Sequence, residues 1–259
     1  MKGNLLMKKL LFGFGAAGIL AAGLAAPASA ADLPARTYTK APVVAPYPML
    51  DWSGFYLGAE GGGGFGSDSL FFPAAGTSTG RFDTSGAIAG GVIGYNWQAP
   101  GSSWVFGVEG NFDWADIGGS TICPNTAFNC GTNLNEIFTG TGRIGYAWNS
   151  VLMYAKGGYA WTNDRADVFD PATGAIGDST GRSGRDGYTL GVGLEYMFAP
   201  NWSAKVEYDY YNFGGRTVNA NTPAGAFVEP ITMTNYSVNA VKAGINYHFN
   251  WGSPVVARY

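Results

Sequence analysis

The sequence predicts an all-β fold, an eight-stranded antiparallel up-and-down transmembrane β-barrel with short periplasmic turns and long outer loops. Three observations predict it. Eight segments alternate apolar residues with polar or small ones, which is the period of a β-strand. Short and long connections alternate strictly between these segments, as in outer membrane barrels. The chain also begins with a segment typical of exported proteins.

Residues 1–30 read as a secretory signal peptide, with a basic start, an apolar run and a small-residue cleavage motif. We expect cleavage between Ala30 and Ala31. The alternative is a retained anchor helix, but the apolar run at 10–26 lies near the lower length limit for a membrane span and ends at Pro27. The proline-rich segment 31–50 is expected to be a periplasmic linker, 51–250 the barrel, and 251–259 a C-terminal tail.

The composition departs from that of a soluble globular protein. Glycine accounts for 41 of 259 residues, aromatic residues for 15% and charged residues for only 13%, against about a quarter charged in typical soluble domains. Loss of residues 1–30 removes three lysines and no acid, so 12 basic residues face 18 acidic ones and the formal charge is −6. No basic footprint for nucleic acid remains.

The expected strands and connections follow from the alternation. Strands are expected near 53–65, 85–98, 104–114, 133–148, 151–164, 188–198, 202–210 and 236–250. Short turns are expected at 99–101, 148–150 and 199–201, and long Gly/Ser/Thr/Asn-rich loops at 66–84, 115–132, 165–184 and 214–234. After the signal peptide, no segment approaches 18 consecutive apolar residues. In hydrocarbon, strands of this kind must close into a barrel, because an open edge leaves backbone groups unpaired.

Aromatic residues gather at the ends of the expected strands and predict the two interfacial girdles of a membrane barrel. These residues are Phe55, Trp97, Trp104, Trp114, Trp148, Trp161, Phe198, Trp202, Tyr247 and Phe249. Alternatively, they are the buried core of a soluble barrel or sandwich. The opposite face of the strands distinguishes these two possibilities.

The opposite face carries six acids and four bases among many glycines. They are Glu60, Glu109, Asp113, Arg143, Lys156, Glu195, Lys205, Glu207, Asp209 and Lys242. At mid-membrane depth such charges must pair away from lipid, so we expect an ion-pair network in the lumen. In a soluble barrel the same charges would face solvent. An eight-stranded lumen is just wide enough for side chains, and a filled interior argues against a wide pore.

The remaining reactive residues are few. Cys123 and Cys130 are expected to form a disulfide in an outer loop, since a metal site would require more Cys or His nearby. The single histidine, His248, is expected to form hydrogen bonds in the lumen rather than to act as a catalytic base. We therefore expect no catalytic residue, metal or cofactor. Acidic and basic residues between Asp164 and Asp186 are expected in a solvated, flexible loop, with cation or lipopolysaccharide binding as the alternative.

Several motifs resemble the outer membrane β-barrel family, in particular its OmpA-like or opacity-type eight-stranded members of Gram-negative bacteria. They are the ASA-ADLP exit of the signal, WSGFYLGAEGG at 52–62, GYNWQ at 94–98 and VKAGINYHF at 241–249. The last is similar to the C-terminal strand signal that the barrel-assembly machinery reads, although residues 250–259 follow it here. The resemblance implies a surface-exposed protein of the cell outer membrane, sometimes porin-like and in some relatives host-interacting or haem-binding.

The leading hypothesis is a non-catalytic barrel that supports envelope integrity and interacts with surface partners through its outer loops. A narrow porin for small solutes is the main alternative, and a lipid- or peptide-hydrolysing barrel is disfavoured because no catalytic set is present. The expected partners are outer membrane lipid and lipopolysaccharide, the barrel-assembly machinery during biogenesis, and host or surface ligands at the loops. Nucleic acid is not expected as a partner.

Overall fold

The computed structural model describes residues 50–249, and these form an all-β molecule with a closed barrel. The expected signal peptide with its Ala30/Ala31 cleavage point, the linker apart from Leu50, and the 251–259 tail lie outside the described residues. Within residues 50–249, no helix has the length and apolar character needed to cross a membrane.

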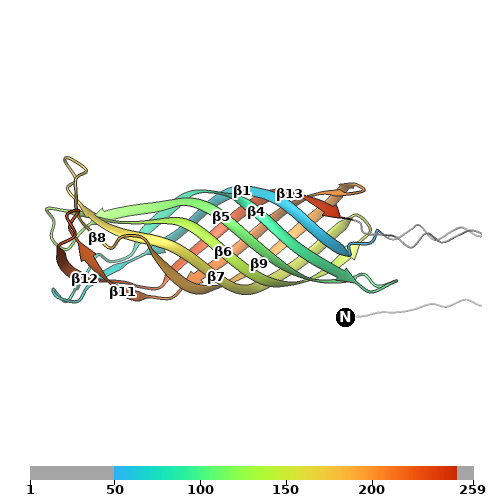
Figure 1. Ribbon diagram of the computed structural model, residues 1–259, viewed down its shortest axis with the longest axis horizontal. Coiled ribbons are helices and arrows are strands. Elements are labelled where there is room, and N and C mark those ends of the chain that lie inside the picture. Colours follow the sequence, from blue (N-terminus) through green and yellow to red (C-terminus); the bar gives the residue numbers. More distant parts are fainter. Residues whose placement is uncertain (1–49, 250–259) are drawn as a thin grey trace, which may run out of the picture. The chain divides into compact units, whose positions relative to one another are not determined.

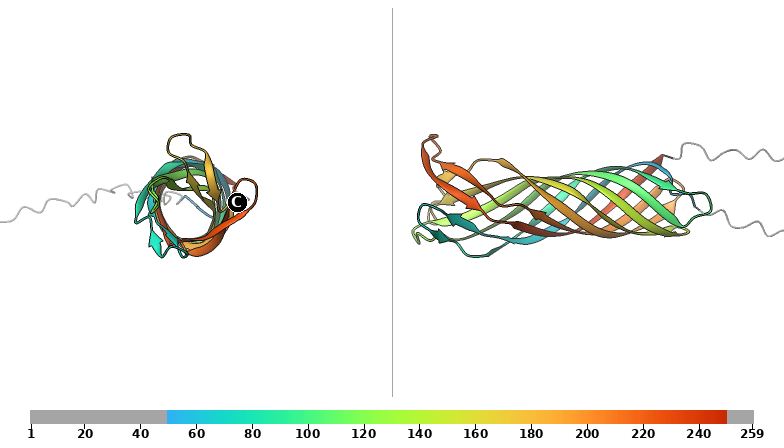
Figure 2. Two further views of the ribbon diagram at one scale, coloured as in Figure 1. Left: turned by 90° about the vertical axis from the view of Figure 1, so that its left-hand side faces the viewer. Right: turned by 90° about the horizontal axis from the view of Figure 1, so that it is seen from below.

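Eight long strands make the barrel, and each is antiparallel to its neighbours (Figure 1). They are β1 (Gly54–Asp68), β4 (Phe82–Gln98), β5 (Trp104–Ile122), β6 (Asn129–Trp148), β7 (Val151–Phe169), β9 (Ser183–Ala199), β10 (Trp202–Phe213) and β13 (Tyr236–Phe249). The first strand pairs with the last in the register Phe55↔Phe249. The strands therefore form a complete ring, which Figure 2 shows end-on, and the predicted fold class is confirmed.

Short turns close one end of the barrel, as the sequence predicts. β6 and β7 are joined through Asn149 and Ser150 alone. Asn149 has a φ of 55° and is the only described non-glycine residue with a positive φ. Two-residue hairpins need such a conformation, and asparagine tolerates it better than most residues do. The turn between β4 and β5 uses Gly101, with a φ of 74°, in the same way.

The long connections differ from the expectation, because strands extend far into them. Five short strands also form there: β2 (Leu70–Phe72), β3 (Thr77–Ser78), β8 (Ile176–Ser179), β11 (Arg216–Asn221) and β12 (Phe227–Met233). They continue the sheet in the order β3-β2-β12-β11-β8-β7, at the end of the barrel opposite the short turns (Figure 1). Beyond the lipid, the outer face of a strand meets water, so the apolar alternation that marks the membrane part is lost.

Candidate functional site

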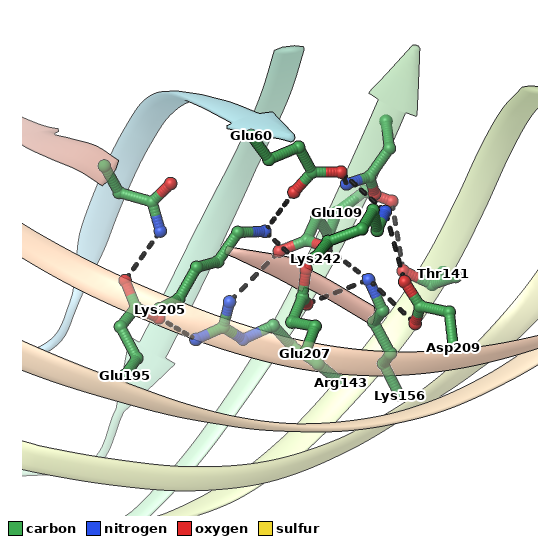
Figure 3. A network of polar contacts seen from close by, with 12 residues as sticks. Glu60, Glu109, Thr141, Arg143, Lys156, Glu195, Lys205, Glu207, Asp209 and Lys242 are labelled. Atoms are coloured by element: carbon green, nitrogen blue, oxygen red, sulfur yellow. Dashed lines mark hydrogen bonds and ion pairs between the residues drawn. The ribbon is translucent and has the colours of Figure 1, made fainter. Parts of the chain in front are cut away.

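The charged residues predicted for the lumen all lie inside the barrel and form one connected network, and Figure 3 labels each of them except Asp113. Alternation places them there, because every second side chain of a barrel strand points inward. All ten are buried: Glu60, Glu109, Asp113, Arg143, Lys156, Glu195, Lys205, Glu207, Asp209 and Lys242. They come from six strands, β1, β5, β6, β7, β9 and β10, with Lys242 from a seventh, β13.

Arg143 and Lys156 organise one side of the network. Arg143 lies 3.1 Å from Glu109 through Nη1 and 2.9 Å from Glu195 through Nη2. Lys156 Nζ contacts three carboxylates, those of Glu109 at 3.1 Å, Glu207 at 2.9 Å and Asp209 at 3.3 Å. Each cation therefore bridges carboxylates from different strands.

Lys205 and Lys242 complete the network on the other side. Lys205 Nζ lies 2.7 Å from both Glu60 Oε2 and Glu207 Oε2. Lys242 Nζ lies 2.6 Å from Glu60 Oε1, 3.2 Å from Asp113 Oδ2 and 3.1 Å from Asp209 Oδ2. Buried ions are tolerated only when they are paired. Every cation of the network has carboxylate partners, and Arg143, Lys156 and Lys242 also donate hydrogen bonds to them.

Two tyrosines belong to the network, and the sequence reasoning missed them. Tyr56 donates to Glu109 Oε2 at 2.7 Å and accepts from Arg143 Nη1 at 2.9 Å. Tyr154 donates to Glu207 Oε1 at 2.8 Å, and its ring centre lies 4.2 Å from the guanidinium carbon of Arg143. The alternation of side chains along a strand predicts their inward orientation, because Tyr56 follows the outward-facing Phe55 and Tyr154 lies two residues before the inward-facing Lys156.

The outer half of the lumen is apolar, which the sequence reasoning did not anticipate. A cluster of buried side chains fills it, comprising Ile88, Ala115, Ile117, Leu134, Ile137, Ala160, Tyr211, Phe213, Tyr236, Val238 and Ala240. Along each strand that carries both kinds, these residues lie farther from the short turns than the charged ones do. The lumen therefore has an ion-pair layer towards the short turns and an apolar layer farther from them.

A second ion cluster lies beyond the apolar layer. Arg185 Nη2 lies 2.8 Å from Asp164 Oδ2 and 3.9 Å from Asp68 Oδ2, and Arg185 Nη1 donates to the carbonyl of Thr234 at 2.9 Å. Asp164 and Arg185 were expected in a solvated, flexible loop, but both are buried. Strands β7 and β9 extend past the expected loop boundary, and alternation then turns these two side chains inward.

The end of the barrel with the short turns is also filled. Trp52 packs there with Val105, Leu152 and Met197 in a buried apolar cluster. The Trp52 indole N–H donates to the carbonyl of Asn149 at 3.3 Å. Side chains therefore pack the described interior in successive layers: an apolar cap, the ion-pair network, the apolar layer and the second ion cluster.

The predicted girdle residues lie on the outside of the barrel. Phe55, Trp97, Trp104, Trp148, Phe198, Trp202, Tyr247 and Phe249 lie at the strand ends near the short turns, and Trp114 and Trp161 lie towards the outer ends. Trp161 and Tyr247 are half-buried against neighbours, and the other eight are exposed. Rings of this kind prefer the headgroup level of a bilayer, so the apolar surface between them spans the hydrocarbon.

The family model of the outer membrane protein beta-barrel domain matches residues 16–249 of the chain. The chain belongs to this family. The chain is similar to the 31 kDa outer-membrane immunogenic protein of Brucella melitensis biotype 1, which is 30% identical over 244 residues, 89% of this chain and 97% of the relative. The 22 kDa outer membrane protein of Rhizobium leguminosarum bv. viciae is 27% identical over 78% of this chain and 80% of its own.

Among solved structures, the chain is similar to the outer membrane protease OmpT of Escherichia coli. The TM-score is 0.48, and the identity is 14% over 76% of this chain and 97% of that one. The curated relatives and the closed barrel together locate this family member in the outer membrane. The short turns then face the periplasm, and the long connections face outward.

In this outer membrane barrel, His248 lies beside a serine and a carboxylate. Its Nε2 is 2.8 Å from Ser203 Oγ and 3.3 Å from Glu195 Oε1. Ser203 Oγ donates to that same Glu195 oxygen at 2.6 Å. A catalytic triad needs the acid on the other ring nitrogen of the histidine, where it orients the ring. Here serine and acid share one nitrogen, and Ser203 is fully buried. This cluster is suited to hydrogen bonding within the lumen.

A disulfide joins Cys123, the first residue after β5, to Cys130 near the start of β6. Both sulfur-bearing side chains pack in an apolar cluster at the outer end of the barrel with Leu70, Val168 and Met233. This cluster draws residues from all four outer connections or the strand extensions beside them. The outer loops of this family member are therefore built on a common apolar core.

Proposed function

We propose that this protein is a non-catalytic outer membrane barrel that supports envelope integrity and interacts with partners through its outer loops. The observation that carries the proposal is the packed interior, in which ion pairs and apolar layers occupy the space that a diffusion path would need. The side chains available to bind a partner then lie mainly in the outer connections. There, five short strands and a disulfide fix the shape of the loops.

The partners follow from the surface of the barrel. The apolar band between the aromatic girdles suits outer membrane lipid and lipopolysaccharide, and the terminal strand β13, which ends in Tyr247 and Phe249, suits the barrel-assembly machinery. Host or surface ligands would bind the outer loops. One relative is named an immunogenic protein, a property that surface exposure of such loops would favour.

Conductance in a planar bilayer, measured together with heat-modifiable gel mobility, tests the proposal against the narrow-porin alternative. We expect the folded mature chain to shift in mobility on heating and to give no discrete channels. Discrete channels from folded protein would refute the closed-barrel role. If Lys156→Glu abolished such channels, the alternative would replace it.

The loops are tested separately, in cells that lack the native protein. A variant in which a short Gly/Ser turn replaces residues 217–232 removes most of the β11–β12 hairpin but leaves the membrane part intact. We expect it to restore detergent resistance as the wild type does, yet to lose binding of surface partners. If the shortened and the full-length protein bind surface partners equally well, the β11–β12 hairpin does not contribute to that binding.

A further inference from the structure

A pocket with a volume of about 330 Å³ lies at the outer end of the barrel. Every outer connection contributes to it, through Phe72 from β2, Phe128 from the β5–β6 connection, Asp178 from β8 and Glu229 from β12. Its volume lies at the small end of the range for ligand pockets, about 300–1,000 Å³. The pocket therefore suits a ligand with one ring or a short chain.

Apolar groups make up much of the pocket wall. Phe72, Val168 and Cys123 are buried members of the outer apolar cluster, and Phe128 packs against that cluster. The disulfide holds the β5–β6 connection in place beside them. A wall that is packed from behind and bonded covalently is formed before any ligand arrives, which lowers the entropic cost of binding.

The charged groups in the lining are both acidic. Asp178 is only 9% exposed, and within residues 50–249 its carboxylate accepts no hydrogen bond and forms no ion pair. Glu229 is half-buried and close enough to Asp178 for repulsion between the two carboxylates. The described lining contains no Lys, Arg or His. The two carboxylates therefore place negative charge in the pocket that no described cation neutralises, and a cation from outside the chain would neutralise it.

We propose that this pocket binds a small organic cation with one ammonium group on an apolar body about the size of an aromatic ring. The ammonium would pair with Asp178 and Glu229, and the body would contact Phe72 and Phe128, whose rings also attract cations. A metal ion fits less well, because no three His, Cys, Asp or Glu side chains gather for one in the described part of the chain. The inference rests on the proposed function, since it names a ligand class for the outer loops.

The titration of the two acids gives the inference a pH signature. Burial raises the pKa of Asp178, and burial together with the nearby Asp178 raises the pKa of Glu229. These are the titratable groups of the described lining. A bound cation favours the ionised carboxylates, so affinity should increase as the pH rises through their pKa values and level off above them.

The experiment measures binding of fluorinated phenethylammonium by fluorine NMR to the full mature chain in nanodiscs of zwitterionic lipid. Fluorinated phenethyl alcohol, with the same ring and no charge, is the matched ligand. Asp178→Asn removes the charge and keeps the shape, and Ala75→Trp fills the pocket from its exposed rim. Asp83→Asn is the matched control, because it removes an exposed acid of β4 that is not part of the lining.

We expect saturable binding of the cation by the wild type and by Asp83→Asn. Asp178→Asn and Ala75→Trp should weaken it at least about tenfold, the factor that 1.4 kcal/mol represents, and the alcohol should bind at least about tenfold more weakly than the cation. Folded wild type that shows no saturable binding, or Asp178→Asn that binds as the wild type does, would overturn the inference. Ligand binding and bilayer conductance are separate measurements. Failure of the binding experiment would therefore leave the closed-barrel proposal standing, and only discrete channels would refute that proposal.

Discussion

Arg143 Nη2 lies 2.9 Å from Glu195 Oε2, and the pair links β6 to β9, two strands that share no hydrogen-bonded ladder. Hydrogen bonds between neighbouring strands hold the ring together around its circumference. Ion pairs such as Arg143–Glu195 and Lys156–Glu109 act across the interior, so they brace strands that the ladders leave unconnected. The stability of the barrel should therefore depend on individual lumenal charges.

Arg143→Met should destabilise the barrel by about 3–5 kcal/mol, because it leaves the buried Glu109 and Glu195 each short of a cation. The urea concentration at which the compact gel form disappears measures the loss. Arg165→Ala is the control, since Arg165 is 41% exposed and pairs only with Asp167; exposed pairs contribute about 1 kcal/mol or less. Equal losses in the two variants would contradict a bracing role for the lumenal network.

Gly62→Ala should impair folding, because the added methyl carbon would clash with the carbonyl oxygen of Val241, a backbone atom that cannot move without shifting β13. Overpacking of this kind costs about 1–3 kcal/mol. Gly140→Ala, on the lipid-facing side, meets nothing within 4 Å and should fold as the wild type does. The yield of heat-modifiable protein after refolding compares the two, and equal yields would argue that β1 and β13 adjust freely.

Replacing both Cys123 and Cys130 by alanine should loosen the β5–β6 connection and leave the barrel folded. Closing so short a loop contributes roughly 2–3 kcal/mol in the chain-entropy model. Limited proteolysis should therefore cut the variant between these residues, while its heat-modifiable mobility is retained. Loss of the mobility shift would instead mean that the disulfide is needed for barrel assembly.

The protection of β8 and β12 against hydrogen exchange should be greater near pH 4 than at neutral pH. Burial raises the pKa of Asp178 in the folded state, so the folded protein binds the proton more tightly than the unfolded chain does. That contribution to stability is present at low pH and is lost as the pH rises through the folded pKa. Asp178→Asn should reduce the difference, once rates are corrected for intrinsic exchange. If the difference in protection between the two pH values is the same in Asp178→Asn, it arises from other titratable groups.

The membrane part of the fold could be predicted because lipid outside and packed side chains inside impose opposite demands on successive residues. That alternation places Lys156 and Glu109 in the lumen and Trp104 on the lipid face. The network contacts of Tyr56 do not follow from the charge pattern, because its side chain is uncharged, although its position beside Phe55 is sufficient to turn it inward.

The outer half could not be predicted in the same way. Ile137 faces the lumen although it is as apolar as its lipid-facing neighbour Phe138, so polarity alone does not assign its face. Beyond the lipid, water meets the outer face of the strands, and the Gly/Ser/Thr/Asn composition there is also that of a loop. The pairing of β12 with β2, which joins two separate connections, depends on tertiary geometry that no local pattern encodes.

The pairing of β1 with β13 also has a consequence for a chain whose last strand is not yet in place. A chain still lacking its last strand would expose unpaired N–H and C=O groups along both β1 and β10, at a cost of several kcal/mol for each group in hydrocarbon. The lumenal lysine of β13, Lys242, would be missing as well. Asp113 would then lose the cation it pairs with in the described structure, and Glu60 and Asp209 would each lose one of two. A chain without β13 would therefore lack both the backbone partners and the lumenal cation that the closed ring supplies, and hydrocarbon would disfavour it strongly.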